Sequence, residues 1–519
     1  MGTRLWLLGG ALFACLLTTE IYATAKVDQD VLDDMESNEV STVIIHLDGQ
    51  YDLKTLPAKF DSREARIDYM VEKLKAFTNE KSQRLRTYLK DTAEGVEEVT
   101  PIWITNSLRV RAPGKVLQEI MAMNGIERIS LHAPKALDKL GESNGSLFVD
   151  PEGENQISWG VEKVRAPELW EKQVQGQGIR VAIIDTGINF THPDLAPQMW
   201  KNPGESGLDD EGRDKSTNGI DDDGNGFIDD LMGFNFEAKN SDISDDGGHG
   251  SKVAGIVAGN GSKGIQTGVA PKATIVGIKS CCGSGTSIFE SNTWEGMQYA
   301  VISKVRVISM SLSAKYYSNP TYNKWRRASE VILQAGIVHI NSAGNLGSGN
   351  TPKNIGAPAT NPPAWLHPLQ KLVGGLSAMI TIGATDEDDK LRSYSSTGPV
   401  TWEGIEGYGD YAYENGVKMG LTKPEVCGPS EVPSTSQFGE GYTNSFGGTS
   451  SATPNVAGVA TLLLSARPDL TVEQVTETLM MSAVEVNAES KFDNKCGAGR
   501  VDAVAAVDYA NAHFSKPTK

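Results

Sequence analysis

From about residue 157 onward, apolar strand-like segments alternate with Gly- and Ala-rich helical segments, and this alternation constrains the fold more than any other feature. Strands separated by helices are typical of a parallel sheet that is covered on both faces. We therefore expect an α/β, doubly wound parallel sheet over residues 157–514. The expected strands are residues 179–185, 274–279, 305–310, 337–342 and 379–383.

Residues 26–135 form a separate pattern ahead of this sheet. A β-branched strand (42–47) precedes an amphipathic helix whose apolar residues recur at helical spacing from Ile67 to Tyr88. Two strands (101–105 and 107–111), a short helix (116–123) and a last strand (126–131) follow. This β-α-β-β-α-β order predicts a small ferredoxin-like α+β unit. Residues 136–156 are polar and Gly-rich, which is typical of an exposed linker that proteases cut.

The N-terminus carries a targeting signal. Arg4 precedes an apolar run over residues 5–17, and Ala23-Thr24-Ala25 offers small residues for cleavage, so residues 1–25 are interpreted as a signal peptide of a secreted protein. No later apolar stretch is long enough to predict a membrane span. The net charge of −18 argues against nucleic acid as a partner, because such partners are bound through surplus Lys and Arg.

Three short segments carry residues suited to nucleophilic catalysis. Asp185 ends an apolar strand in VAIIDTG, His249 lies in GGHGSKVAG, and Ser450 opens an apolar helix in GGTSSATPNVAG. Taken singly, these residues could cap a turn, begin a helix or cap its N-terminus. Together they supply a nucleophile, a base that accepts its proton and a carboxylate that orients the base.

The order Asp185, His249, Ser450 and the three segments resemble the subtilisin-like serine peptidases over residues 157–510. The resemblance implies an endopeptidase in which Asp185 orients His249, His249 is the general base and Ser450 is the nucleophile. It also implies that Asn345, in the Ala-Gly-Asn segment after a strand, donates its amide to the oxyanion. Residues 26–135 would then be an inhibitory, folding-assisting propeptide, which is cut off within the 136–156 linker.

The same resemblance implies where a protein or peptide substrate binds. Residues expected to wall the pocket before the scissile bond or to pair with the substrate backbone are Ser311, Leu312, Ser313, Ala343, Gly344, Ser284 and Gly285.

An acidic segment between the Asp and His boxes predicts a structural Ca²⁺ site. Its oxygen-bearing side chains stand at every second position ahead of a glycine turn, as in the first half of a calcium loop. The predicted ligands are Asp221, Asp223, Asn225, the carbonyl of Phe227 and Asp229. A solvated acidic loop without an ion is the alternative.

Two further questions stay open at this point. Cys281, Cys282, Cys427 and Cys496 could form disulfides, but the sequence does not decide which cysteines pair. A catalytically silent, calcium-dependent binding protein on the same scaffold is the rival function. The intact set of Asp185, His249, Ser450 and Asn345 argues against that rival.

Overall fold

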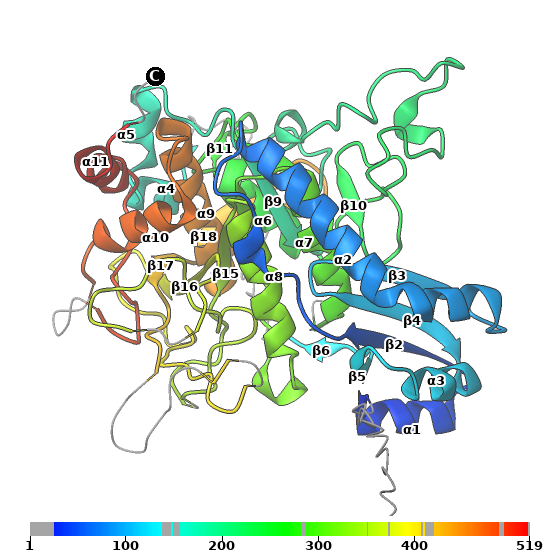
Figure 1. Ribbon diagram of the computed structural model, residues 1–519. Helices are drawn as coiled ribbons and strands as arrows, with labels where there is room; N and C mark the ends of the chain where they lie inside the picture. The colour runs from blue at the N-terminus through cyan, green and yellow to red at the C-terminus, as the bar shows by residue number, and fades with distance from the viewer. Residues whose placement is uncertain are drawn as a thin grey trace, which may run out of the picture.

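The structure is a computed structural model that describes residues 25–137, 147–148, 156–281, 286–349, 351–371, 374–405, 408–409, 420–486 and 492–516. Residues 25–137 are called the N-terminal unit below, and residues 156–516 the main unit. The predicted signal peptide and most of the predicted linker lie outside the described residues (Figure 1). None of the described helices is both long and apolar enough to cross a membrane.

The N-terminal unit consists of one sheet with helices packed against it. Its sheet has the order β1-β5-β2-β4-β3, antiparallel except where β1 pairs with β5. The elements are β1 (Lys26–Val27), α1 (Gln29–Ser37), β2 (Val40–Leu47), α2 (Arg63–Asp91), β3 (Glu98–Ile102), β4 (Ser107–Pro113), α3 (Gly114–Met121), β5 (Ile126–Leu131) and β6 (Lys135–Ala136). Every strand and helix expected between residues 42 and 131 is present. The strand expected at 101–105 is found at 98–102. It ends earlier than expected because residues 103–106 form the turn that leads into β4.

The main unit is built on a seven-stranded parallel sheet of order β10-β12-β9-β14-β15-β16-β17. Its strands are β9 (Arg180–Asp185), β10 (Gly233–Asn235), β12 (Thr274–Lys279), β14 (Val307–Met310), β15 (Val338–Ser342), β16 (Met379–Thr385) and β17 (Val426–Pro429). All five strands expected from the sequence are found, while β10 and β17 were not expected. The parallel α/β prediction is therefore confirmed.

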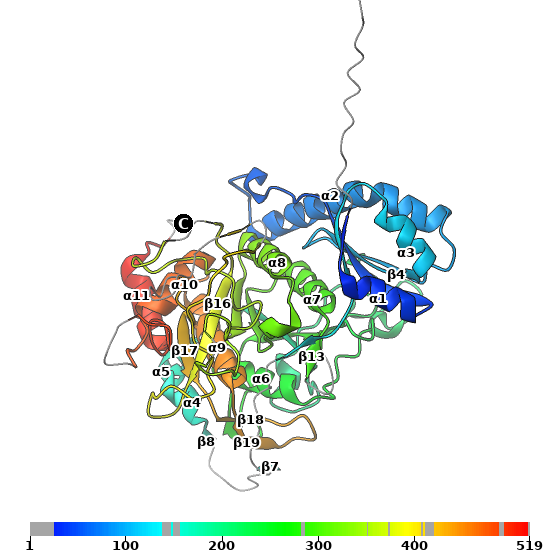
Figure 2. The same ribbon diagram turned by 90° about the horizontal axis from the view of Figure 1, so that it is seen from below.

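Helices cover both faces of this sheet, as a parallel sheet requires. The helices α6 (His249–Ala258) and α9 (Thr449–Ala466) pack together on one face, while α7 (Glu290–Ile302) and α8 (Tyr322–Gln334) pack on the other (Figure 2). The remaining elements are β7 (Leu147–Phe148), β8 (Gln156–Ile157), α4 (Trp159–Lys163), α5 (Ala166–Glu171), β11 (Ile265–Gln266), β13 (Ser287–Ile288), β18 (Val432–Thr435), β19 (Tyr442–Phe446), α10 (Val472–Met481) and α11 (Ala503–His513).

The N-terminal unit docks on the α7 and α8 face of the main unit (Figure 2). Ile67, Met70 and Leu74 recur at helical spacing on α2 and are buried in the same apolar cluster as the main sheet. Residues such as Val43 and Ile45 of β2 belong instead to a second core inside the N-terminal unit. The two units therefore share an apolar interface, while the N-terminal unit also has a core of its own.

Candidate active site

Asp185 and His249 meet at the carboxyl end of β9, near the middle of the sheet. Asp185 is the last residue of β9 and His249 is the first of α6, and both are buried. The Oδ1 atom of Asp185 lies 2.7 Å from Nδ1 of His249 and also accepts the backbone N–H of Thr186 at 2.8 Å. A carboxylate bonded to Nδ1 favours the tautomer in which Nε2 accepts a proton. Nε2 is buried and has no hydrogen-bond partner among the described residues.

The approach of α6 to β9 depends on a glycine and a carboxylate. A Cβ atom on Gly250 would lie 2.2 Å from the carbonyl oxygen of Gly187, so a side chain there would push the helix away from Asp185. Asp245 holds the start of α6, since its carboxylate accepts the N–H groups of Gly248 at 2.6 Å and Ser251 at 2.8 Å. Sequence reasoning did not single out Asp245, although an acidic residue just before a helix is a recognisable capping signal.

Ser450 lies in the first turn of α9, after the glycine pair Gly447-Gly448. Gly448 has φ of 78°, a backbone conformation that favours glycine. The Ser450 hydroxyl donates to the carbonyl of Ser311 at a long 3.5 Å, and the Ser311 hydroxyl donates back to the Ser450 carbonyl at 2.9 Å. No hydrogen bond joins Ser450 to His249 in the described part of the chain. Such bonds are often long or absent when no substrate is bound.

Asn345 is oriented by the residue that precedes Ser450. Its Oδ1 atom accepts the backbone N–H of Thr449 at 2.9 Å and the Thr449 hydroxyl at 3.0 Å. Since the oxygen is bonded to Thr449, the amide nitrogen Nδ2 is the donor on this side chain. The first turn of α9 adds backbone N–H groups that a helix leaves without intrahelical acceptors. The start of α9 and Asn345 together therefore offer donors suited to an oxyanion.

The residues predicted to wall the substrate pocket follow two neighbouring strands. Ser311, Leu312 and Ser313 follow β14, while Ala343 and Gly344 follow β15, which pairs with β14. The Ser313 hydroxyl donates to the carbonyl of Ser342 at 2.6 Å, which joins the two segments. Ser284 and Gly285 lie outside the described residues.

The end of the N-terminal unit runs as a strand beside these segments. β6 pairs antiparallel with β13, and the N–H of Leu137 donates to the carbonyl of Thr286 at 3.0 Å. On its other side, the carbonyl of Ala136 accepts the N–H of Lys315 at 2.8 Å. Residues 135–137 thus bridge the segment that follows the predicted substrate-pairing residues and the segment that follows Ser313.

Comparison with known proteins agrees with this geometry. The sequence model of the subtilase family matches residues 176–499, which is more than half of the chain. The chain belongs to the subtilase family. Similar proteins include alkaline elastase YaB of Bacillus sp. (strain YaB), 27% identical over 72% of this chain and 77% of that protein, and subtilisin E of Bacillus subtilis (strain 168), 26% identical over 67% and 73%. Subtilisin-like protease 1 of Plasmodium berghei (strain Anka) is 28% identical over 72% of this chain and 57% of its own length. This chain is accordingly a subtilisin-like serine peptidase, a hydrolase that acts on protein or peptide substrates.

The acidic segment of this subtilase gathers a different set of carboxylates from the one expected. Oxygen atoms of Glu205, Asp221 and Asp223 all lie within 4.8 Å of one another. Glu205 is fully buried, and its Oε2 atom has no hydrogen-bond partner within the described segments. Burial, together with the charges of nearby aspartates, raises the pKa of Glu205 to about 7. A cation between these carboxylates would relieve that repulsion, and hard oxygen donors suit Ca²⁺.

Two of the other predicted ligands, Asn225 and Asp229, make contacts within the loop, while the Phe227 side chain packs against α7. The Asn225 amide nitrogen donates to the carboxylate of Asp230 at 3.1 Å, and Asp229 accepts the N–H of Gly219 at 3.0 Å. The Phe227 ring packs edge-on against Tyr299. Sequence reasoning missed Glu205, because it precedes the loop by sixteen residues and no repeating pattern marks it.

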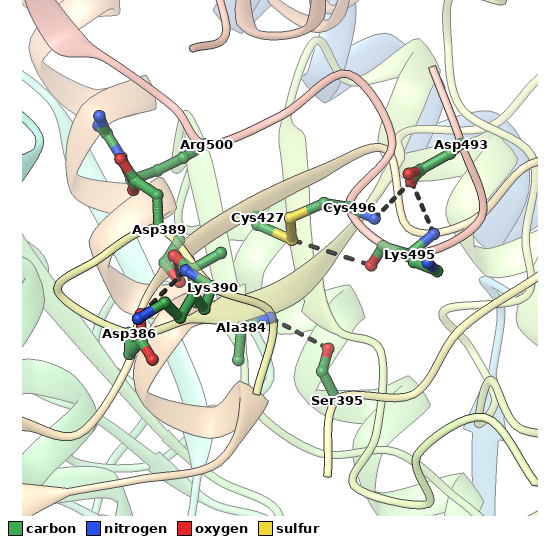
Figure 3. The surroundings of a disulfide bond; sticks show 12 residues. Ala384, Asp386, Asp389, Lys390, Ser395, Cys427, Asp493, Lys495, Cys496 and Arg500 are labelled. Atoms are coloured by element: carbon green, nitrogen blue, oxygen red, sulfur yellow. Dashed lines mark hydrogen bonds and ion pairs between the residues drawn. A yellow bond between two sulfur atoms is a disulfide. The ribbon is translucent and has the colours of Figure 1, made fainter. Parts of the chain in front are cut away.

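A disulfide joins Cys427 on β17 to Cys496, in the segment between α10 and α11 (Figure 3). Both cysteines are buried, and the carboxylate of Asp493 accepts the N–H of Cys496 at 2.9 Å. This pairing answers one question that the sequence left open. Cys281 is buried at the end of the described segment before the substrate-pairing residues, and Cys282 lies outside the described residues.

Proposed function

We propose that this subtilase is a secreted serine endopeptidase that acts through Asp185, His249 and Ser450 and is made as a self-processing zymogen. The observation that carries the proposal is the 2.7 Å contact between Asp185 and Nδ1 of His249, with Nε2 left to act as a base. The buried disulfide between Cys427 and Cys496 supports secretion, because disulfides persist in oxidising compartments.

The proposed reaction has two stages. Nε2 of His249 takes the proton from the Ser450 hydroxyl as Oγ attacks the scissile carbonyl carbon, and Asp185 stabilises the imidazolium. Asn345 Nδ2 and the Ser450 backbone N–H stabilise the oxyanion. His249 then gives its proton to the leaving amine, which departs and leaves an acyl-enzyme. Water, deprotonated by His249, hydrolyses that ester and restores the Ser450 hydroxyl.

The N-terminal unit is proposed to be the propeptide. Its β-α-β-β-α-β order and its strand order β5-β2-β4-β3 support a ferredoxin-like unit. The pairing of residues 135–137 supports its role as an inhibitor that occupies the non-primed side of the cleft. The next described residues, Leu147 and Phe148, pair with β19, which leads into the Ser450 turn. These pairings favour a cut between residues 138 and 147, inside the 136–156 linker.

The deciding experiment compares the full chain with its Ser450→Ala variant in calcium-containing buffer, using intact mass and gels over time. We expect the parent chain to lose its N-terminal unit and the variant to stay whole. The masses of the two fragments then identify the bond that is cut. If both chains fold and neither is cut, self-processing is wrong. An organophosphorus label then tests the rival hypothesis of a catalytically silent binding protein. That hypothesis predicts that no covalent adduct forms on Ser450.

We further propose that Glu205, Asp221 and Asp223 hold a structural Ca²⁺, with Asn225, the Phe227 carbonyl and Asp229 completing or supporting the loop. The bound ion would supply charge neutralisation and rigidity rather than chemistry. The buried, unpartnered Oε2 of Glu205 is the observation that fits a cation.

Calcium removal tests this site through stability. Ca²⁺ at about 100 times its dissociation constant is expected to raise the free energy of unfolding by about 3 kcal/mol. Chelation should therefore lower the melting temperature. Glu205→Gln should remove most of the calcium-dependent shift in a melting experiment. Asp210→Asn, at an exposed position in the same segment, is the matched control and should keep the shift. A Glu205→Gln chain with an undiminished shift would exclude Glu205 as a ligand.

A further inference from the structure

Two arginines near the start of α2 reach into the main unit. Arg63 donates to the carbonyl of Ala335 at 3.0 Å, to that of Lys304 at 3.2 Å and to that of Val305. Arg66 donates to the carbonyl of Gln334 at 2.8 Å and to its side-chain oxygen at 2.5 Å. All these acceptors belong to the main unit, and both donors belong to the N-terminal unit.

The acceptors lie where α7 and α8 end. α7 ends at Ile302 and is followed by Lys304 and Val305, while α8 ends at Gln334 and is followed by Ala335. The last carbonyls of a helix lack intrahelical donors and carry partial negative charge, which applies here to Gln334 and Ala335 at the end of α8. Lys304 and Val305 belong to the segment between α7 and β14. A guanidinium can bond several backbone carbonyls at once because its donors form a planar fork.

Backbone carbonyls, rather than carboxylates, accept the hydrogen bonds of these guanidinium groups. Among the residues that the structure describes, Arg63 has one acidic ion-pair partner, its neighbour Glu64, which lies 3.6 Å away and is half exposed. Burial and the nearby positive charges of Arg306 and Arg180 lower the pKa of Arg63 to about 10. Arg63 therefore lies among like charges in a partly buried place, where backbone carbonyls of the main unit stabilise it.

This contact is separate from the cleft. Residues 135–137 pair with β13, which leads into α7, and with Lys315, which precedes α8. The arginines bind at the opposite ends of the same two helices, about 20 Å away for helices of this length. Figure 2 shows α2 passing over this end of α8. The N-terminal unit thus holds both ends of the α7 and α8 pair.

We propose that Arg63 and Arg66 form a second anchor, independent of the cleft, which keeps the N-terminal unit bound to the main unit after the linker is cut. That this unit inhibits the peptidase rests on the proposed function, but the anchoring itself does not.

The test uses a full chain that carries Ser450→Ala and a recognition sequence for a site-specific external protease within residues 141–146. The external protease makes the cut, so the result does not depend on self-processing. Gel filtration at serial dilutions then gives the concentration at which the N-terminal fragment leaves the main unit. The variants are Arg63→Ala with Arg66→Ala, the double lysine replacement, and Arg86→Ala as control. Arg86 is exposed on the same helix and bonds to Asn79 there.

The alanine pair is expected to raise the dissociation constant at least about tenfold, since several charge-assisted hydrogen bonds are lost. The lysine pair should recover only part of this, and Arg86→Ala should match the parent. If the alanine pair fails to fold, Arg66→Ala alone gives a smaller shift in the same direction. Equal dissociation of the alanine and parent chains would overturn the anchor. A chain with Ser450 intact that never cuts itself would refute self-processing and leave this result standing.

Discussion

The hydrogen bonds of Asn345 decide what its side chain can do. Thr449 occupies the amide oxygen with its N–H and its hydroxyl, at 2.9 and 3.0 Å, and Thr449 is also the residue before Ser450. One short segment therefore positions both the proposed nucleophile and the proposed oxyanion donor. Coupling of this kind keeps their relative geometry fixed even if the α9 turn shifts slightly.

Replacing Asn345 by alanine should lower kcat by about 10²–10³-fold and leave KM nearly unchanged. The reason is that the hydrogen bond from the Asn345 side-chain amide to the oxyanion forms in the transition state and not in the ground state. Steady-state kinetics on a peptide substrate measure both constants. Titration with an organophosphorus label confirms that Ser450 still reacts, so that the loss is not misfolding. An unchanged kcat would contradict the proposed role.

At the scale of elements, the disulfide ties the edge of the main sheet to the chain that leads into α11. β17 carries Cys427, and its exit contacts the nucleophile turn, because the Ser430 hydroxyl donates to the carbonyl of Gly448 at 2.8 Å. The disulfide closes a loop with a sequence separation of 69 residues. It thereby stabilises the strand that backs the start of α9.

Cys427→Ser together with Cys496→Ser should lower the free energy of unfolding by about 4 kcal/mol, as expected for a closed loop of this length. Denaturant melts of the Ser450→Ala chain, which avoids self-digestion, measure this loss. Addition of a reductant should bring the parent to the same midpoint and leave the double variant unchanged. A double variant as stable as the oxidised parent would show that the disulfide is dispensable.

Elements with a long, regular pattern could be predicted from the sequence. The strands β9, β12, β14, β15 and β16 lie in apolar runs and the helix α2 has helical periodicity, and all were expected. β10 and β17 have only three and four residues and include glycine or proline, so no pattern marked them. Asp185, His249, Ser450 and Asn345 could be chosen from their local segments. Glu205 could not, because only tertiary packing brings it beside Asp221 and Asp223. Asp245 carried a local capping signal ahead of α6 that the sequence analysis did not use.

At the scale of the whole molecule, a histidine lies at the interface between the two units. His132 follows β5 of the N-terminal unit, stacks on the ring of Phe289 and bonds the Ser291 hydroxyl at 3.0 Å in the main unit. Burial lowers the pKa of His132 to about 4, and the positive charges of Arg109 and Lys239 act in the same direction, opposed by Glu98. His132 is therefore neutral in the docked state over most of the pH range.

Docking of the N-terminal unit should weaken in acid because of this histidine. Once undocked, His132 loses the burial that is the main cause of this shift, so its pKa rises toward the ordinary value of about 6.5 and it binds a proton that the docked state excludes. Its contribution to docking is thus fully present above about pH 6.5 and falls as the pH drops toward 4, by roughly tenfold or more in affinity at pH 5. Dissociation of the externally cut Ser450→Ala chain, measured at pH 7.5, 6 and 5, follows this loss.

The matched variant is His132→Gln, which keeps a polar side chain for Ser291 but does not titrate. His46, whose pKa burial also lowers, is bonded to Ser107 and Ser130 and is present in both chains, so the difference between their pH profiles isolates His132. The parent should dissociate more steeply with falling pH than the variant. Superimposable profiles would mean that His132 is protonated equally in both states, and acid release would then have to come from other groups at the interface, such as His46 or the carboxylates.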